Sequence, residues 1–413
     1  MPYRGKPCHC FKTYPYEPPG GKEYGPAYTS GIPMLCGLIE VVVMPQRSGN
    51  GIYELQESSC EEATAAMLHL DGRSFSGSGT IVRFGVPLAA LVGQDLHLTH
   101  IRARRNPPGL RPQHLTAVEA VTQVCQGSLE GGTVGSQDLL FRPGRLPQEG
   151  HFQWDIGTAG STTMLALALL PVLAFAQGSL SFHLTGGLFQ DFAPSAFHLQ
   201  HALLPLLRRM GLHAELCILR PGYVPRGGGS LALTVEPVHG TLRPLLLRER
   251  GETLCYWGLA LASHLQQRQV SQRMATACQQ VLHRRGIHAE FRLLDDTTAP
   301  QAGAALALFA EGANALLGAD QAGAPRRPAE AIGRFVARAL LDDLASGATV
   351  DRYLADQLII FAALAAGTSV LHLPQITDHV PTNLWLVETI LGAHVHLEGH
   401  QLSIQGIGYT SPH

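Results

Sequence analysis

The sequence predicts an α/β (α+β) protein in which one helix–strand unit is used three times. Three stretches pass from an apolar, helix-like period to a glycine and then to the alternating period of a strand. Each glycine stands where a helix commonly ends in a left-handed residue. The three runs are 81–92, Gly93 and 96–101; 163–177, Gly178 and 180–184; and 353–366, Gly367 and 369–373.

Each unit continues with a second helix that also ends at a glycine. Residues that alternate between apolar and polar then predict another strand. The helices are 114–126 before Gly127, 196–210 before Gly211, and 383–391 before Gly392, and the clearest strands are 213–218 and 393–397.

The spacing of equivalent glycines shows where the repeat is interrupted. Gly93 and Gly178 are 85 residues apart, whereas Gly178 and Gly367 are 189 residues apart. An insertion of about 100 residues therefore lies between the second and third units. Its patterns predict a small α/β domain, with helices at 253–265 and 329–344 and strands at 291–294 and 304–309.

These features divide the chain into four parts. The parts are a flexible N-terminal extension (1–66), units one and two (67–238), the inserted small α/β domain (239–347) and unit three (348–413). The extension fits none of the repeats. Met67 directly precedes a predicted strand at 68–70 and is a candidate start of the folded chain.

Composition excludes several classes of protein. A net charge of −2 argues against a protein that coats nucleic acid, but it permits a local pocket for one nucleic-acid end. The eight cysteines are scattered and form no CxxC pair, so we expect a reduced, cytoplasmic setting. The most apolar run, 164–176, contains Pro171 and is too short to cross a bilayer, so we expect no membrane partner.

Arginines gather in the stretch 99–120. Arg102, Arg104, Arg105 and Arg111 come in or just after the first unit's strand, and Gln113 opens the next helix. Guanidinium groups and a helix N-terminus together can hold phosphate. A solvated basic loop is the simpler interpretation of this stretch taken alone.

Two further motifs stand at predicted helix starts. Asp356 and Gln357 fall in the first turn of a very apolar helix, where an acid stabilises the helix dipole or holds a divalent cation on a triphosphate. His379 lies just before Pro381, which we expect to begin a helix whose positive end favours neutral, nucleophilic imidazole. Because the chain holds 20 histidines, spacing alone does not single out His379.

Together, seven ordered motifs resemble the RNA 3′-terminal phosphate cyclase family, from about residue 68 to residue 405. The resemblance is weakest in the insertion, and the family's fold is three repeated α/β units with an inserted α/β domain. The motifs lie at 71–83, 101–118, 135–144, 156–161, 225–229, 353–358 and 379–388.

This resemblance implies an ATP-dependent reaction. A histidine attacks the α-phosphorus of ATP, the adenylate passes to an RNA 3′-phosphate end, and the 2′-hydroxyl displaces AMP to give a 2′,3′-cyclic phosphate. The resemblance implies His379 as the nucleophile and Asp356 as a ligand of Mg²⁺ or Mn²⁺. By the same resemblance, the ATP and phosphate contacts are Arg83, Arg105, Gln113, Asp356 and Gln357, with Pro194 and Tyr353 on either side of the adenine.

Two alternatives stay open. Ser76 stands where the family usually has a glutamate, which favours a non-catalytic relative that binds RNA or ribosome-assembly factors. His379 favours an active enzyme, because the non-catalytic branch lacks that histidine. An enolpyruvyl-type transferase is suggested by fold analogy alone, and it predicts neither a nucleophilic histidine nor the motif at 353–357.

Overall fold

The computed structural model describes residues 67–145, 149–251 and 254–411. The predicted extension 1–66 lies outside these residues. All described residues belong to one compact unit.

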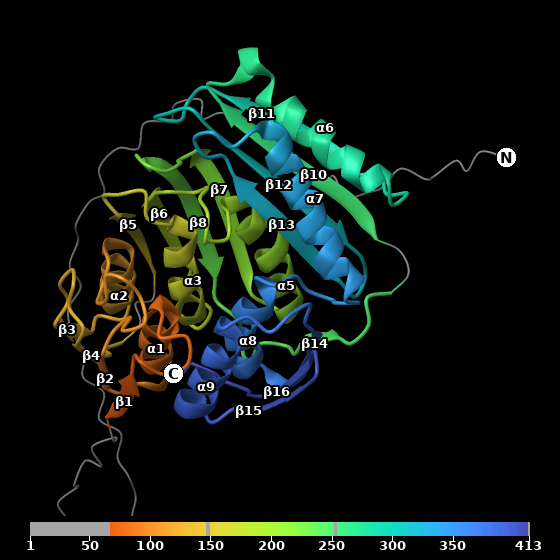
Figure 1. The fold of residues 1–413 in the computed structure, drawn as a ribbon. Helices are drawn as coiled ribbons and strands as arrows, with labels where there is room; N and C mark the ends of the chain where they lie inside the picture. Colours follow the sequence, from red (N-terminus) through yellow and green to blue (C-terminus); the bar gives the residue numbers. More distant parts are fainter. Residues whose placement is uncertain (1–66, 146–148, 252–253, 412–413) are drawn as a thin grey trace, which may run out of the picture. The chain divides into compact units, whose positions relative to one another are not determined.

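The described chain runs three times through the same order of elements, strand–helix–strand–helix–strand–strand (Figure 1). The first series holds β1 (Leu68–Asp71), α1 (Gly79–Val92), β2 (Leu96–Thr99), α2 (Pro112–Val124), β3 (Ser128–Glu130) and β4 (Leu139–Arg142). The second holds β5 (Gly150–Asp155), α3 (Thr162–Leu173), β6 (Leu180–Gly186), a composite helix, β7 (His213–Arg220) and β8 (Gly229–Glu236). The composite helix is α4 (Ala196–His198), a π-helical turn (Leu199–Leu203) and α5 (Leu204–Met210). The third holds β9 (Leu246–Leu247), α8 (Leu354–Leu364), β14 (Ala366–His372), α9 (His379–Leu391), β15 (His394–Glu398) and β16 (Gln401–Ile407).

Each series forms a four-stranded sheet with the same pairing. The strand orders are β1-β2-β4-β3, β5-β6-β8-β7 and β9-β14-β16-β15. In every case the first two strands are parallel and the other pairs are antiparallel. The predicted α/β fold class is therefore confirmed.

The helices of the three series pack against one another. Helix α1 contacts α2, α3 and α9, and α8 contacts α3 and α9. Every residue of α3 except Met164 is buried, as is every residue of α8 except Asp356. A helix that is apolar on all sides belongs in the interior, which explains the central position of α3 and α8. Among the described helices, none combines the length and apolarity needed to span a membrane.

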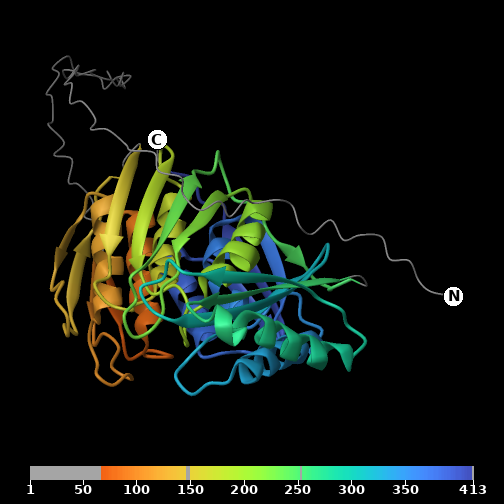
Figure 2. The ribbon, with the colours of Figure 1, turned by 90° about the horizontal axis from the view of Figure 1, so that it is seen from above.

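A fourth sheet lies between β9 and α8 in the sequence, with order β11-β10-β12-β13. Helices α6 and α7 pack on each other and against this sheet (Figure 2). Its elements are β10 (Cys255–Ser263), a 3-10 turn (Gln266–Arg268), α6 (Val270–His283), β11 (Glu290–Asp296), β12 (Gly303–Glu311), β13 (Leu316–Ala322) and α7 (Ala329–Ala345). The predicted helix at 329–344 and the predicted strands at 291–294 and 304–309 are confirmed.

The helix predicted at 253–265 is wrong. Residues Cys255–Ser263 form β10, a central strand that pairs with both β11 and β12. A strand buried on both faces carries a continuous apolar run, which does not show the alternation of a half-exposed strand.

Three of the six predicted glycine caps are confirmed and three are wrong. Gly93, Gly211 and Gly392 cap α1, α5 and α9 in the left-handed conformation. Helix α3 already ends at Leu173, and Gln126 rather than Gly127 has the positive φ after α2. Gly367 has a φ of 111°, but it lies inside β14 rather than at a helix end.

Strand β9 lies apart from the rest of its sheet in the sequence. Leu246 and Leu247 pair with Val370 and Leu371 of β14, so these two residues of the segment 239–347 belong to the third sheet. The division of the chain into four parts stays a prediction.

We expect Gly333→Ala to lower the free energy of unfolding by about 1–3 kcal/mol. A Cβ on Gly333 of α7 would lie 2.3 Å from the Met274 carbonyl oxygen of α6, so the two helices must separate. This cost exceeds the roughly 1 kcal/mol by which alanine favours a helix over glycine. Urea denaturation measures the difference. Arg338→Ala on the exposed face of α7 is the control, and a Gly333→Ala protein as stable as the Arg338→Ala protein would show that the helices part freely.

Candidate active site

His379 is the first residue of α9, so this helix begins two residues before the predicted start at Pro381. Its Nδ1 lies 2.9 Å from Oγ1 of Thr80, in the first turn of α1. Two helix N-termini therefore meet at this imidazole, and their partial positive charges disfavour a protonated ring. No hydrogen bond from a described residue reaches Nε2, which leaves this nitrogen for another partner.

Burial and positive charge keep His379 neutral. Burial is the larger cause, and the Arg83 and Arg105 charges add to it, so the pKa of His379 falls to about 4. The arginine predicted from the basic loop, Arg105, thus acts on the imidazole electrostatically. At neutral pH the ring carries a free lone pair, as a nucleophile requires.

The loop before α1 is tied to the first turn of α9. The Ser76 backbone N–H donates to Oγ1 of Thr382 at 3.2 Å, and the Ser76 and Ser78 hydroxyls are 2.9 Å apart. Ser78 also caps α1, because its Oγ accepts from the Thr80 N–H. These contacts fix Thr80 beside His379.

Arg83 follows Thr80 by one turn of α1 and lines a small pocket. The pocket is lined by Val82, Arg83, Gln113, His114, Ala117 and Met164. Burial lowers the pKa of Arg83 to about 10, against the opposing effect of Asp356, so the guanidinium stays charged at neutral pH. No described residue accepts a hydrogen bond from this guanidinium, so its donors are available to an anion.

Gln113 brings a third helix N-terminus to the site. Its Oε1 accepts a hydrogen bond of 3.1 Å from the backbone N–H of Ser161, the N-cap of α3. The structure thus gathers Arg83, Gln113 and His379, from three separate sequence motifs, near the N-termini of α1, α3 and α9.

His114, the residue after Gln113, lines the same pocket, although the sequence alone predicts no role of its own for it. Its ring lies against Gly79, where a Cβ would be 2.1 Å from the His114 Nε2. Burial, reinforced by Arg83, Arg102 and Arg111, lowers the pKa of His114 to about 3. The ring therefore packs as a neutral group beside the start of α1, and its place next to Gln113 in the sequence was the available signal.

Asp356 lies on α8 close to Arg83. Burial raises the pKa of Asp356 to about 7, although the Arg83 charge lowers it. The Asn383 amide donates to the Asp356 carbonyl oxygen at 2.8 Å and connects α9 to α8. Near neutral pH this carboxyl is therefore divided between its protonated and ionised forms.

The metal predicted at Asp356 has few protein ligands. Within the described residues, no group of three His, Cys, Asp or Glu side chains could hold an ion. The buried amide oxygens of Gln357 and Asn383 have no hydrogen-bond partner among the described residues. A Mg²⁺ ion held by Asp356 would therefore take most of its ligands from phosphate and water.

Pro194 and Tyr353, predicted to flank the adenine, are connected through a buried polar network. Next to Pro194, the Ser195 N–H donates to Asp320 Oδ2 at 2.9 Å. The Tyr353 N–H donates to Asp351 Oδ1 at 2.8 Å, and the Tyr353 ring meets the His198 ring edge-on at 5.9 Å. The His198 N–H donates to Ser195 Oγ at 3.1 Å and joins the two parts, so the network fixes the backbone at Ser195 and at Tyr353, while Tyr353 is 38% exposed.

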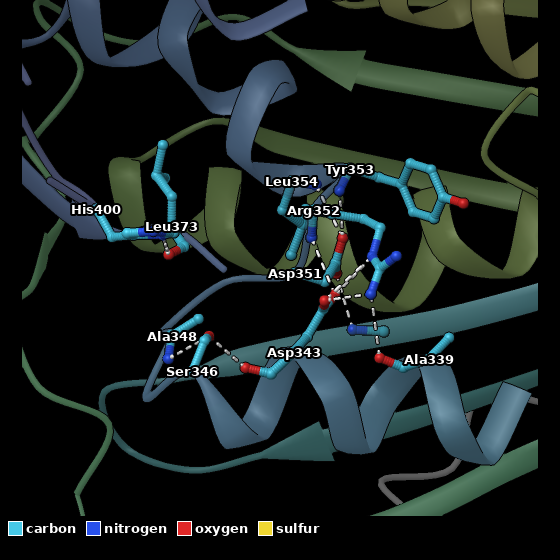
Figure 3. A network of polar contacts seen from close by, with 11 residues as sticks. Ala339, Asp343, Ser346, Ala348, Asp351, Arg352, Tyr353, Leu354, Leu373 and His400 are labelled. Atoms are coloured by element: carbon cyan, nitrogen blue, oxygen red, sulfur yellow. Dashed lines mark hydrogen bonds and ion pairs between the residues drawn. The ribbon is translucent and has the colours of Figure 1, made fainter. Parts of the chain in front are cut away.

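The centre of this network is an ion pair between His198 and Asp351, 3.0 Å apart and fully buried. Asp351 also accepts from the backbone N–H groups of Gly318 and Leu354, and Figure 3 shows its contacts at the start of α8. Beside it, Arg352 donates to Asp343 of α7. Burial alone would lower the pKa of His198, but the charge and hydrogen bond of Asp351 raise it overall. Nothing in the sequence signals this pair, because its members are 153 positions apart.

We expect His198→Gln to destabilise the protein by about 3–5 kcal/mol at pH 6, because it leaves Asp351 buried without its cation. The folded-state pKa of His198 is raised, so its contribution is complete below the unfolded value of about 6.5 and is lost as pH rises through the folded value. Urea denaturation across this range should therefore show that the free energy of unfolding of the parent falls as pH rises. The variant should lack this decline.

His201→Gln is the matched control. Burial lowers the pKa of His201 to about 4, so this residue affects stability below pH 6.5 and with the opposite sign. If the pH-dependent fall in stability disappeared equally in His198→Gln and His201→Gln, the role given to the His198–Asp351 pair would be wrong.

A family model and the curated relatives of this chain carry the same family name. A model of the family described as RNA 3'-terminal phosphate cyclase matches residues 74–397. An RNA 3'-terminal phosphate cyclase of Hyperthermus butylicus is 37% identical over 83% of this chain and 99% of its own length. The protein of the same name from Methanothermobacter thermautotrophicus is 36% identical over 81% of this chain and 97% of its own length.

Solved structures give only a weak likeness. The enolpyruvyl transferase NikO from Streptomyces tendae aligns with 84% of this chain and 50% of its own, at 12% identity and a TM-score of 0.36. On the family match and the identities of its relatives, the chain belongs to the RNA 3′-terminal phosphate cyclase family.

Proposed function

We propose that this protein uses ATP to convert the 3′-terminal phosphate of an RNA to a 2′,3′-cyclic phosphate, through a covalent adenylate on His379. The observation that carries this proposal is the neutral imidazole held at the N-termini of α1 and α9, with the charged Arg83 guanidinium nearby. A nucleophile and a phosphate-binding cation are the two groups that nucleotidyl transfer needs.

The Thr80 contact is compatible with the tautomer that the reaction requires. We assign the imidazole proton to Nδ1, which donates to Thr80 Oγ1 and leaves the lone pair on Nε2. The Nε2–phosphorus bond forms as the bond to the leaving pyrophosphate breaks. Nδ1 then loses its proton or keeps it according to the pH of the medium, and Thr80 holds the ring orientation in either case.

Positive groups balance the charge that develops on the phosphates. Arg83 supplies guanidinium donors, and the positive N-terminal end of α1 adds to their effect. Arg105 and Gln113 complete the proposed phosphate contacts. When a divalent cation is bound, it stabilises the negative charge on the leaving pyrophosphate, and Asp356 would hold it beside Gln357.

The second half of the reaction exchanges one phosphorus bond for another. An oxygen of the RNA 3′-phosphate attacks the adenylate phosphorus, and the His379 imidazole leaves as the neutral ring. The 2′-hydroxyl oxygen then attacks the 3′-phosphorus, releases AMP and loses its proton. Pro194 and Tyr353 are the proposed adenine contacts. The His198–Asp351 pair fixes the backbone at Tyr353 and at Ser195, next to Pro194.

A second candidate is a non-catalytic relative that binds RNA or ribosome-assembly factors. Ser76 favours it, because this residue is engaged with Ser78 and Thr382 and offers no carboxylate at that position. The two candidates differ in one observable, a covalent adduct formed from ATP alone.

We expect the parent protein to form an acid-labile, alkali-stable adenylate adduct with α-labelled ATP, and we expect His379→Ala to abolish it. A phosphoramidate has this stability pattern because protonation of its nitrogen makes imidazole a good leaving group. Denaturing electrophoresis of the labelled protein measures the adduct, with His372→Ala as a control histidine on β14. If His379→Ala still became labelled, another residue would be the nucleophile. If the parent itself stayed unlabelled, the non-catalytic candidate would be favoured.

We also expect the rate of adenylylation at limiting ATP to rise with pH through about 7, the pKa of Asp356 in the free protein. Ionised Asp356 can hold a cation, whereas His379 is already neutral above about pH 4 and adds no step there. Single-turnover rates of adenylylation, measured from pH 5 to pH 9, test this expectation. Asp356→Asn should lower the rate and remove the step, and a step near 7 that persists in this variant would assign it to another group.

A further inference from the structure

We propose that Phe75 and Trp385 form a stacking platform for the base of the 3′-terminal RNA nucleotide; this inference rests on the proposed function. Phe75 is 46% exposed, in the loop between β1 and α1. Its ring centroid lies 5.4 Å from that of Trp385 on α9, with an interplanar angle of 33°. The exposed Phe75 ring thus packs on a residue of α9, the helix that begins with His379.

The loop holds Phe75 in an unfavourable backbone conformation. Its φ is 45°, in the left-handed region that bulky residues rarely adopt. The Phe75 carbonyl oxygen accepts a hydrogen bond of 2.5 Å from Arg104 Nη1, and the Arg104 N–H donates to the Gly77 carbonyl oxygen at 3.3 Å. Strain that neighbouring contacts maintain in this way is concentrated at ligand-binding positions.

The platform is joined to the reacting group by short connections. Ser76, next to Phe75, bonds to Thr382, which follows His379 by one turn of α9. Thr80, in the first turn of α1 just after this loop, bonds to His379 itself. An RNA 3′-phosphate at His379 therefore brings its own nucleotide to the Phe75 loop.

Charge around the platform identifies the occupant. The adjoining loop carries Arg102, Arg104, Arg105 and Arg111, and none of these forms an ion pair with an acidic residue in the described part of the chain. Exposed aromatic rings beside unneutralised arginines are the combination that binds single-stranded nucleic acid, because bases stack on the rings while phosphates contact the guanidinium groups. Since every base has a flat face, such a platform accepts any 3′-terminal base.

The test compares two RNA oligonucleotides with a 3′-phosphate, one normal and one abasic at the terminal nucleotide. We expect the full-length parent to bind the abasic RNA about 10-fold more weakly, measured by fluorescence anisotropy without ATP. Equal binding of the two RNAs by the parent would overturn the proposal, with no variant required.

Variants then assign the effect to Phe75. Phe75→Ala should bind both RNAs with the weaker affinity and should no longer distinguish them, whereas Phe75→Trp should restore the difference. Phe335→Ala is the matched control, because Phe335 on α7 is 47% exposed and lies outside the platform. The platform would be refuted if Phe75→Ala still distinguished the two RNAs as well as the parent does. It would also be refuted if a polyglutamate peptide displaced the bound RNA as well as unlabelled RNA does.

Binding and adenylylation separate the two proposals. A parent that distinguishes the two RNAs but forms no adduct with ATP would refute the proposed reaction and keep the platform. A parent that forms the adduct on His379 but ignores the terminal base would refute only the platform.

Discussion

The hydrogen bond between Thr80 and His379 joins residues that are 299 positions apart in the chain. It brings the N-terminus of α1, from the first series of elements, to the N-terminus of α9, from the third. Every chemical property proposed for this site depends on that meeting. It orients the imidazole and places it within the positive field of two helices, and it brings the Phe75 loop beside it.

Central apolar helices make this meeting possible. Helices α3 and α8 are buried on nearly all sides and support α1 and α9, which contact each other directly. A leucine or isoleucine that becomes fully buried contributes roughly 1.5–3 kcal/mol, so a row of such residues outweighs the cost of bringing several positive groups together. The polar site is therefore held by an apolar interior rather than by its own attractions.

Periodicity in the sequence predicts the parts of the fold that repeat a pattern. Helix α7, strands β11 and β12, and three glycine caps are predicted correctly because each depends on neighbouring residues. Strand β10 is mistaken for a helix because an apolar run buried on both faces has no distinguishing period. His379 and Asp356 stand at predicted helix starts, but only the resemblance to a family implies their roles. The His198–Asp351 pair and the packing of His114 on Gly79 are invisible in the sequence, because only tertiary structure brings their members together.

The pairing of β9 with β14 has a consequence for the order of synthesis. Strand β9 leaves the ribosome before the fourth sheet, but its partner β14 follows only after that sheet and its helices. Because domains form from the N-terminus as the chain emerges, the first two series and the fourth sheet can fold while the third sheet is still open. His379 emerges after all of them. A nascent chain therefore cannot acquire its imidazole until the first two series and the fourth sheet have been made, so fragments that end before α9 would lack the proposed nucleophile.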